Sequence, residues 1–207
     1  MARFIVAVTG GIASGKSAVC ARLAVHGAEI VDADEVSREL VAPGQAALAE
    51  IVAAFGADVV DADGALKRRV LRERIFADVP ARRRLEAILH PRVRTVLRER
   101  ALAAACDYAV LAIPLLIESG HYHWVDRIIA VDVDAPTQVR RLMQRDGVDA
   151  ALAQSMLAAQ ATRGERLQIA SDVLINDADL PVLQRMTDRL HGLLLRSARD
   201  AVVRDSR

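Results

Sequence analysis

The chain has 207 residues, the length of one domain with room for inserted lobes, and 53% of them are hydrophobic, enough for a sizeable core. Its 28 basic and 27 acidic residues leave a formal net charge of +1, which argues against binding nucleic acid through bulk charge. The longest apolar run, residues 108–117, is about half of the ~20 residues that span a bilayer. Cys20 and Cys106 are too far apart for a CxxC motif. These features predict a soluble cytoplasmic protein without a membrane or nucleic-acid partner.

Short β-branched runs alternate with longer amphipathic segments along the chain, which is typical of a parallel sheet covered by helices. Strands are expected at residues 4–8, 29–31, 108–113, 127–131 and 172–175. A helix is expected over residues 16–26, which Gly27 is suited to end. Another begins at Leu180, where apolar residues recur at helical spacing, and should cover one face of the sheet. The fold class predicted is therefore α/β.

Two helical regions interrupt this alternation. The first, residues 45–105, is rich in arginine, and turns are expected in it at residues 61–64, 78–80 and 90–91. The second, residues 140–166, is expected to be a helical pair hinged near Gly147. We therefore expect a single domain in which these regions are lobes on a core made of residues 1–44, 106–139 and 167–207.

The glycine-rich stretch "GGIASGKS", residues 10–17, matches the GxxxxGK[ST] pattern of phosphate-binding loops. Small residues let several backbone N–H groups converge on one polyphosphate, and the helix that follows adds the positive end of its dipole. Lys16 is expected to reach the β- and γ-phosphates, and the Ser17 hydroxyl is placed to coordinate Mg²⁺. The preceding strand, the following helix and the rarity of lysine, found otherwise only at Lys67, favour nucleotide binding over a ligand-free turn.

Two carboxylates follow the second expected strand, in "VDADEVSREL". Asp32 and Asp34 should reach the sheet edge where the carboxyl ends of parallel strands meet and where ligands bind in such folds. One of them is expected to accept or hold the proton of an acceptor hydroxyl. The alternative is that both cap a helix beginning near Glu35. Glu118, past the third strand, is expected either to organise Mg²⁺ through water or to cap a helix.

Arginines gather in the second lobe. Arg141 and Arg145 are four residues apart on one expected helix, and Arg163 lies on the returning arm. On a mobile hairpin their guanidinium groups would close over the phosphates; alternatively, they form a solvated basic face paired with nearby acidic residues. The pair His121 and His123 is expected in a surface loop rather than at a metal.

Seven stretches together resemble the bacterial dephospho-coenzyme A kinase family in order and spacing. They read "IVAVTGGIASGKSAV", "VDAD" with "LVAPG", "LRERIF", "HPRV", "IPLLIESG", "VDVDAPTQVRRLMQRD" and "AAQATRGERL", and the resemblance fades only beyond about Ala198. It implies a P-loop kinase fold with a five-stranded parallel core, a helical CoA-side domain and a lid. It also implies transfer of a phosphoryl group from ATP, with Mg²⁺, to the ribose 3′-hydroxyl of dephospho-CoA.

The resemblance further implies roles for single residues. Asp34 corresponds to the catalytic base, Lys16 and Arg141 to catalytic cations, and Ser17 to the magnesium ligand. ATP-binding positions are Gly11, Ala13, Ser14, Gly15, Lys16, Ser17, Ala18, Arg145 and Asn176. Positions toward the acceptor are Asp34, His90, Arg94, Leu116 and Arg163. One departure is visible, because family members usually have glycine where Ala13 stands; if φ is positive there, alanine costs about 1 kcal/mol or more.

Other functions compete with this interpretation. A kinase for another nucleoside or nucleotide acceptor would share the loop, the carboxylate and the arginines. A GTPase is disfavoured because the chain has no Asn-Lys pair and so no NKxD motif. A nucleotide-sensing module would bind ATP without needing Asp34. The expected partners are the small molecules ATP and dephospho-CoA, and the sequence favours a monomer.

Overall fold

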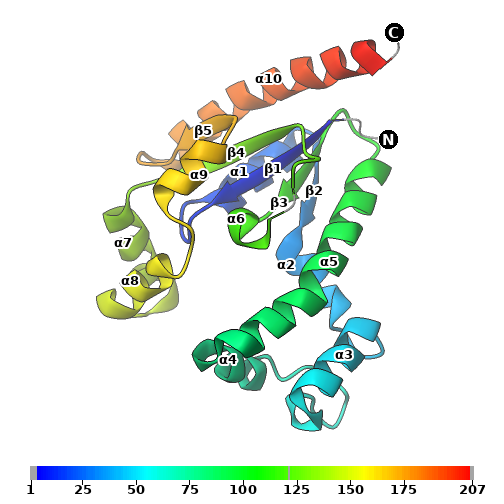
Figure 1. The fold of residues 1–207 in the computed structure, drawn as a ribbon. Coiled ribbons are helices and arrows are strands. Elements are labelled where there is room, and N and C mark those ends of the chain that lie inside the picture. The colour runs from blue at the N-terminus through cyan, green and yellow to red at the C-terminus, as the bar shows by residue number, and fades with distance from the viewer. Residues whose placement is uncertain (1–3, 121, 206–207) are drawn as a thin grey trace. The chain divides into compact units, whose positions relative to one another are not determined.

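The structure is a computed structural model that describes residues 4–120 and 122–205. Its contacts divide the chain into two compact units (Figure 1). We call Met1–Asp32 with Arg100–Arg207 the sheet unit, and Ala33–Glu99 the helical unit. No helix within the described residues is both long enough and apolar enough to cross a lipid bilayer.

The sheet unit contains a five-stranded parallel sheet in the order β2-β3-β1-β4-β5, which confirms the fold class predicted from the sequence. Its strands are β1 (Ile5–Gly10), β2 (Glu29–Asp32), β3 (Ala109–Ala112), β4 (Arg127–Asp132) and β5 (Asp172–Ile175). Its helices are α1 (Lys16–Val25), α6 (Leu116–Ser119), α7 (Ala135–Asp146), α8 (Ala150–Ala158), α9 (Arg163–Ile169) and α10 (Leu180–Asp205). β1 lies between β3 and β4, and because both faces of this central strand are covered, all six of its residues are buried.

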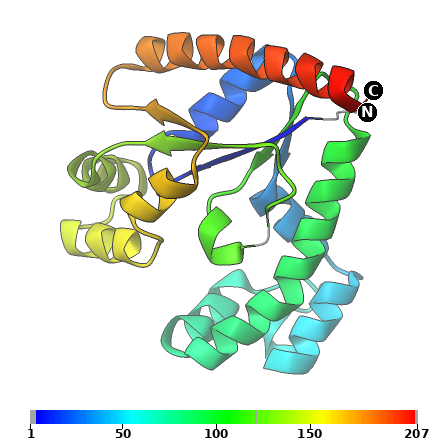
Figure 2. The same cartoon turned by 45° about the horizontal axis from the view of Figure 1, so that its top comes forward.

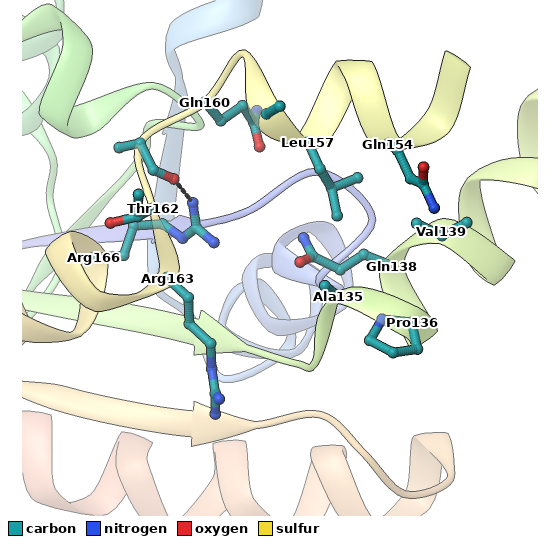
Figure 3. Close-up of a pocket in the computed structure, with 12 residues that line it drawn as sticks. Ala135, Pro136, Gln138, Val139, Gln154, Leu157, Gln160, Thr162, Arg163 and Arg166 are labelled. Atoms are coloured by element: carbon teal, nitrogen blue, oxygen red, sulfur yellow. Dashed lines mark hydrogen bonds between the residues drawn. The ribbon is translucent and has the colours of Figure 1, made fainter. Parts of the chain in front are cut away.

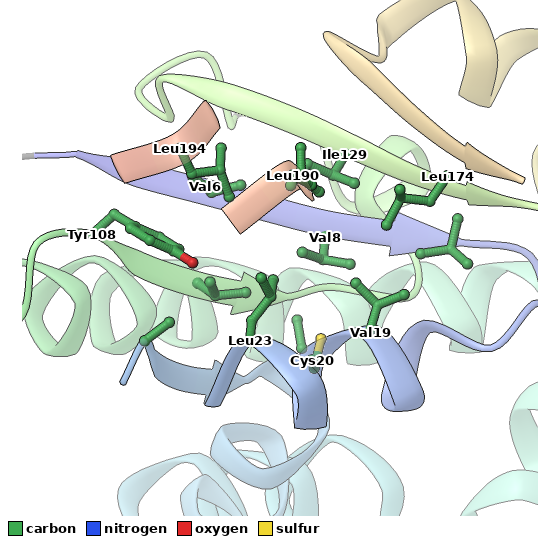
Figure 4. Packing of buried hydrophobic residues seen from close by; sticks show 14 of the residues in the cluster. Val6, Val8, Val19, Cys20, Leu23, Tyr108, Ile129, Leu174, Leu190 and Leu194 are labelled. Carbon is green, nitrogen blue, oxygen red and sulfur yellow. The ribbon is translucent and has the colours of Figure 1, made fainter. Parts of the chain in front are cut away.

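One face of the sheet packs on α1 and α10, which lie on the same side of it (Figure 2). Alternate residues of β1, Val6 and Val8, point to this side and meet Leu23 of α1 and Leu190 and Leu194 of α10 (Figure 4). Burying an apolar side chain of this size contributes about 1.5–3 kcal/mol. The helix expected from Leu180 is thus confirmed, together with its role in covering the sheet.

The helical unit contains α2 (Ala33–Leu40), α3 (Ala46–Phe55), the 3-10 turn η1 (Ala57–Val59), α4 (Arg68–Ala77) and most of α5 (Val79–Ala103). It has a core of its own, built on Val41, Ile51, Val59 and Leu71. The turn expected at residues 61–64 is confirmed: Gly64 has φ 76°, and the carboxylate of Asp61 accepts hydrogen bonds from two backbone N–H groups that follow it.

The turn expected at residues 90–91 is wrong, because α5 runs through it with Pro91 in its interior. Proline lacks the N–H that would bond the carbonyl of Ala87, and its ring crowds that carbonyl. Nη1 of Arg92 donates to the neighbouring carbonyl oxygen, that of Ile88, at 2.6 Å. The hydroxyl of Thr95 also donates to the carbonyl oxygen of Pro91 at 3.0 Å. The helix thus continues through a residue that usually ends one, with these side-chain bonds on either side of it.

Residues 135–169 form three helices, α7 to α9, where a pair was expected over residues 140–166. We call them the three-helix segment. α7 begins earlier than expected because Asp134 caps it, accepting a hydrogen bond from the N–H of Thr137 at 2.8 Å. Gly147, with φ 68°, ends α7 where the hinge was expected. The third helix, α9, starts at a capping box formed by Thr162 and Glu165.

Candidate phosphate-binding site

The glycine-rich stretch forms a tight loop between β1 and α1, which we call the phosphate loop (residues 10–17). Two of its residues have positive φ, Ala13 at 59° and Gly15 at 99°. The N–H of Ser14 donates to the carbonyl oxygen of Gly11 at 3.0 Å, which closes a turn within the loop. Residue 13 therefore has the positive φ at which alanine, unlike glycine, is strained.

The loop delivers Lys16 and Ser17 to the first turn of α1, where Lys16 is half-buried and Ser17 is exposed. The residue before this helix, Gly15, makes no side-chain capping hydrogen bond, and the first turn carries no acidic residue. The first N–H groups of a helix have no partner within the helix, and its dipole places positive charge there. Since no side chain of α1 satisfies this end, it is suited to bind an anion such as a phosphate.

Asn176, which directly follows β5, supports the loop from the sheet side. Its Nδ2 donates to the carbonyl oxygen of Ser14 at 2.7 Å, and its backbone N–H donates to the carbonyl oxygen of Asp132 at 2.7 Å. A Cβ on Gly15 would lie only 2.2 Å from Asn176 Nδ2, so glycine is required there by space as well as by φ. The structure thus brings Asn176 against the loop backbone.

α7 also contacts the loop through two side chains on one face. Nε2 of Gln138 donates to the carbonyl oxygen of Ile12 at 2.6 Å. Arg141, one turn further, donates from Nη1 to the carbonyl oxygen of Ala13 at 3.4 Å and from Nη2 to that of Asn176 at 3.0 Å. The arginine identified from the sequence is therefore adjacent to the loop, and its two bonded N–H groups hold backbone oxygens.

A second glutamine reaches the loop from the end of α8. Oε1 of Gln160 accepts a hydrogen bond from the N–H of Ile12 at 2.8 Å. Figure 3 shows Gln138, on α7, and Gln160, in the connection between α8 and α9, facing the same space. Sequence reasoning missed both glutamines, and no local pattern marks either of them.

Two other arginines of the three-helix segment, Arg145 and Arg163, are held by carboxylates. Arg163 forms a two-pronged salt bridge with Asp132, with Nη2 at 2.6 Å from Oδ2 and Nε at 2.9 Å from Oδ1. Asp132 is buried, and its hydrogen bonds raise the pKa of Arg163. Arg145 pairs with its neighbour Asp146 at 2.7 and 2.8 Å, and this bond lowers the pKa of the Asp146 carboxyl. Arg145 is therefore exposed and paired with an acidic neighbour, as expected if these arginines form a solvated basic face of the helix.

A cavity of about 850 Å³ lies within the three-helix segment (Figure 3). Its walls are mostly apolar, with Gln138, Gln160 and Arg166 among the polar residues that line it. Next to it, Oε1 of Glu118 in α6 accepts a hydrogen bond from the N–H of Ala161 at 2.7 Å. Glu118 therefore ties α6 to the chain between α8 and α9.

The predicted acceptor-side residues fall in both units. Leu116, in α6 of the sheet unit, is buried. In the helical unit α2 starts at Ala33 rather than near Glu35, so Asp34 lies in its first turn. His90 and Arg94 are one turn apart on α5 and share a face.

Burial lowers the pKa of His90, Arg94 lowers it further, and Glu86 opposes the shift. The imidazole is thus biased toward its neutral form, which can donate and accept a hydrogen bond at once. Of the histidine pair considered for a surface loop, His121 lies outside the described residues and His123 is exposed.

A family model for dephospho-CoA kinase matches residues 4–181. The chain belongs to the dephospho-CoA kinase family. A dephospho-CoA kinase of Xanthomonas oryzae pv. oryzae is 54% identical over 193 residues, 92% of this chain and 95% of that protein. A crystal structure from Thermus thermophilus has 30% identity and a TM-score of 0.81, covering 94% of this chain and 99% of that one. The structure of a dephospho-CoA kinase from Campylobacter jejuni, at 23% identity and a TM-score of 0.70, covers 93% and 98% of the two chains and shares the fold.

Membership in this family makes the chain a kinase that acts on a hydroxyl acceptor. The P-loop kinase fold inferred from the sequence is likewise confirmed by the parallel sheet and by these structural relatives.

Proposed function

We propose that this chain transfers the γ-phosphoryl group of ATP to the ribose 3′-hydroxyl of dephospho-CoA, giving CoA and ADP. The observation that carries the proposal is the phosphate loop. It has residues with left-handed backbone conformation at positions 13 and 15. It leads into α1, whose N-terminus is not capped by any side chain of that helix. The chain that contains it belongs to the dephospho-CoA kinase family.

On the donor side, the loop and the start of α1 hold the triphosphate. Backbone N–H groups and Lys16 bind its oxygens and stabilise the negative charge of the transition state. The proposed ATP-binding residues are Gly11, Ala13, Ser14, Gly15, Lys16, Ser17, Ala18, Arg145 and Asn176. Among these, Asn176 acts through the loop backbone, which it holds by its bond to Ser14.

The exposed Ser17 hydroxyl is an oxygen ligand of the type that Mg²⁺ prefers. Among the described residues there is no cluster of three or more potential metal-ligating side chains, so a bound Mg²⁺ would be held mainly by Ser17, phosphate oxygens and water. When bound, the ion neutralises phosphate charge and orients the triphosphate.

On the acceptor side, the Asp34 carboxylate takes the proton of the 3′-hydroxyl as the new oxygen–phosphorus bond forms and the bond to ADP breaks. The proposed substrate-binding residues are Asp34, His90, Arg94, Leu116 and Arg163. Because the acceptor carries a diphosphate, the cationic Arg94 and the neutral His90 on one face of α5 suit complementary parts of it.

We further propose that residues 140–166 act as a lid and residues 45–105 as the CoA-side lobe of one domain. Arg141 is the proposed clamp on the migrating phosphoryl group. A guanidinium has five N–H donors, and two of those of Arg141 are used on the carbonyl oxygens of Ala13 and Asn176. The same side chain can thus brace the loop and still offer donors to a phosphate. The balanced charge of the sequence supports small-molecule substrates, and we propose a cytoplasmic monomer.

The test is turnover of dephospho-CoA by purified variants, followed by ADP release and by locating the new phosphate on the product by NMR. Lys16→Ala and Asp34→Asn should each lower kcat by about 10² or more. Lys67→Ala is the matched control for the first, because Lys67 is the other lysine of the chain and lies at the start of α4. Asp63→Asn, in the exposed turn of the same unit, is the control for the second. Full turnover by Asp34→Asn would remove the assigned base.

The competing acceptors are nucleosides and nucleotides other than dephospho-CoA. The wild-type protein should phosphorylate dephospho-CoA far more efficiently than AMP or adenosine when these compete in one reaction. If kcat/KM for a nucleoside monophosphate were comparable to that for dephospho-CoA, the assignment of dephospho-CoA as the acceptor would be wrong. ATP binding without any transfer would instead indicate a nucleotide sensor.

A further inference from the structure

The phosphate loop carries two unfavourable features. Ala13 is the one residue other than glycine with positive φ among residues 4–120 and 122–205, at 59°. Its Cβ is strained in this left-handed region, which glycine enters freely. The hydroxyl of Ser14 is buried and has no hydrogen-bond partner within the described part of the chain. A loop with such features keeps its shape only if its surroundings hold it.

Side chains outside the loop hold the peptide groups on both sides of Ala13. The φ and ψ angles of a residue set the orientation of the peptide planes before and after it. The plane before Ala13 contains the Ile12 carbonyl, which accepts the 2.6 Å bond from Gln138. The plane after it contains the Ala13 carbonyl, which accepts the longer bond from Arg141. These two donors are three residues apart on α7, on one face of the helix.

Gln138 is closely fitted to this position. The residue is only 5% exposed, although glutamine is usually found at the surface. A Cβ on Gly11 would lie 2.5 Å from its Nε2, so the amide approaches the loop backbone as closely as a glycine permits. A buried amide that lost its acceptor would be strongly unfavourable. The bond to Ile12 therefore stabilises one loop conformation over others.

We propose that Gln138 is a positioning residue that keeps the phosphate loop in its left-handed turn at Ala13, and that this role depends on residue 13 being alanine. Without the bond, the strained alanine draws the loop away from the conformation that binds phosphate. With glycine at position 13, the turn is accessible without strain, and the bond matters less. Of the proposed function, this inference assumes only that the loop binds the phosphates of ATP, and it does not depend on the identity of the acceptor.

A double-mutant cycle tests this dependence. The four proteins are wild type, Gln138→Ala, Ala13→Gly and the double variant. The measurement is calorimetric affinity, with Mg²⁺, for the ATP analogue that has an imido group between the β- and γ-phosphates. Gln138→Ala should weaken binding about tenfold when residue 13 is alanine and about twofold when it is glycine. The coupling is then on the order of fivefold, which corresponds to roughly 1 kcal/mol.

Gln144→Ala is the matched control, because Gln144 is an exposed glutamine on the same helix, and it should show no coupling to residue 13. Gln138→Glu adds a nearly isosteric variant that cannot donate to the carbonyl, and it should reproduce the coupling. An equal loss of affinity in the wild-type and Ala13→Gly backgrounds would overturn the proposal. So would loss of the folded state by both Gln138 variants regardless of residue 13, since Gln138 would then serve the fold alone.

The readout separates this inference from the proposed acceptor. Binding of the analogue requires no dephospho-CoA, so the coupling is measurable whichever hydroxyl compound is phosphorylated. In assays of turnover, the loss caused by Gln138→Ala should fall mainly on KM for ATP, with KM for the acceptor unchanged, and Ala13→Gly should restore most of it.

Discussion

Gly15→Ala is the substitution that most directly tests the geometry of the phosphate loop. Gly15 has φ 99°, where any side chain is strained, and its missing Cβ leaves room for the amide of Asn176. That amide is the partner of the buried Ser14 carbonyl. An alanine would therefore disturb both the backbone torsion and the hydrogen bond that anchors the loop to the end of β5.

The magnitude follows from these two effects. A non-glycine residue in the left-handed region costs about 1–2 kcal/mol. A Cβ at 2.2 Å from Nδ2 of Asn176 cannot be accommodated, so the amide must move and leave the Ser14 carbonyl unpaired. An unsatisfied buried acceptor costs about 1–3 kcal/mol more. We therefore expect Gly15→Ala to lower the free energy of unfolding of the sheet unit by about 2–5 kcal/mol.

The assay is urea unfolding followed by the fluorescence of Trp124, the only tryptophan, which belongs to the sheet unit. Gly27→Ala is the matched control at the other end of α1: its φ is 88°, but a Cβ there would meet nothing within 4 Å. Gly27→Ala should therefore be destabilised by backbone strain alone, which lowers the free energy of unfolding by about 1–2 kcal/mol. In an Asn176→Ala background the steric part of the Gly15→Ala effect should disappear. Equal destabilisation by Gly15→Ala and Gly27→Ala would refute the reasoning.

Four further outcomes are expected. Burial raises the pKa of the Cys20 thiol to about 11, so a thiol reagent at pH 8 should modify the half-buried Cys106 of the native protein and reach Cys20 only after unfolding. Burial lowers the pKa of His191, so stability should decline as pH falls below about 6.5. Hydrogen bonds from Arg22 and then His26 lower the pKa of Asp188, so a second decline should appear below about pH 4. It should be smaller in Asp188→Asn, as acid titration of the unfolding free energy would show. Pro91→Ala should raise the thermal midpoint by restoring a helical N–H in α5, and an unchanged or lower midpoint would contradict the interpretation of that helix.

The strands could be predicted because their signal is local. All five expected runs are strands, and they are rich in the β-branched residues that parallel, buried strands use. Their ends were less accurate: β1 was expected to end at Val8 but continues to Gly10, because Thr9 and Gly10 pair with Ala130 and Val131 of β4. Threonine and glycine carry no apolar pattern, so only the neighbouring strand explains this extension.

Two helix boundaries were wrong, for different reasons. Proline at position 91 predicts a helix break, yet α5 runs through it from Val79 to Ala103. At α7 the local signal was present and was underused, since Asp134 followed by Pro136 marks a helix start. That cap predicts a helix start at Ala135, five residues before the start of the expected lobe at residue 140.

That earlier start of α7 also decides which side chains reach the phosphate loop. The loop could be recognised because its signature is written in consecutive residues: glycines at positions 10, 11 and 15, where a Cβ would not fit, then lysine and serine at the helix start. Its supports could not be, since Gln138 and Gln160 contact Ile12 from 126 and 148 residues away in sequence. A glutamine has no pattern that distinguishes a buried brace from a solvated surface residue. The Asp134 cap fixes where α7 begins, just after β4, which pairs with β1. This starting point determines that Gln138 and Arg141 lie on the face of α7 that contacts the strained peptide at Ala13.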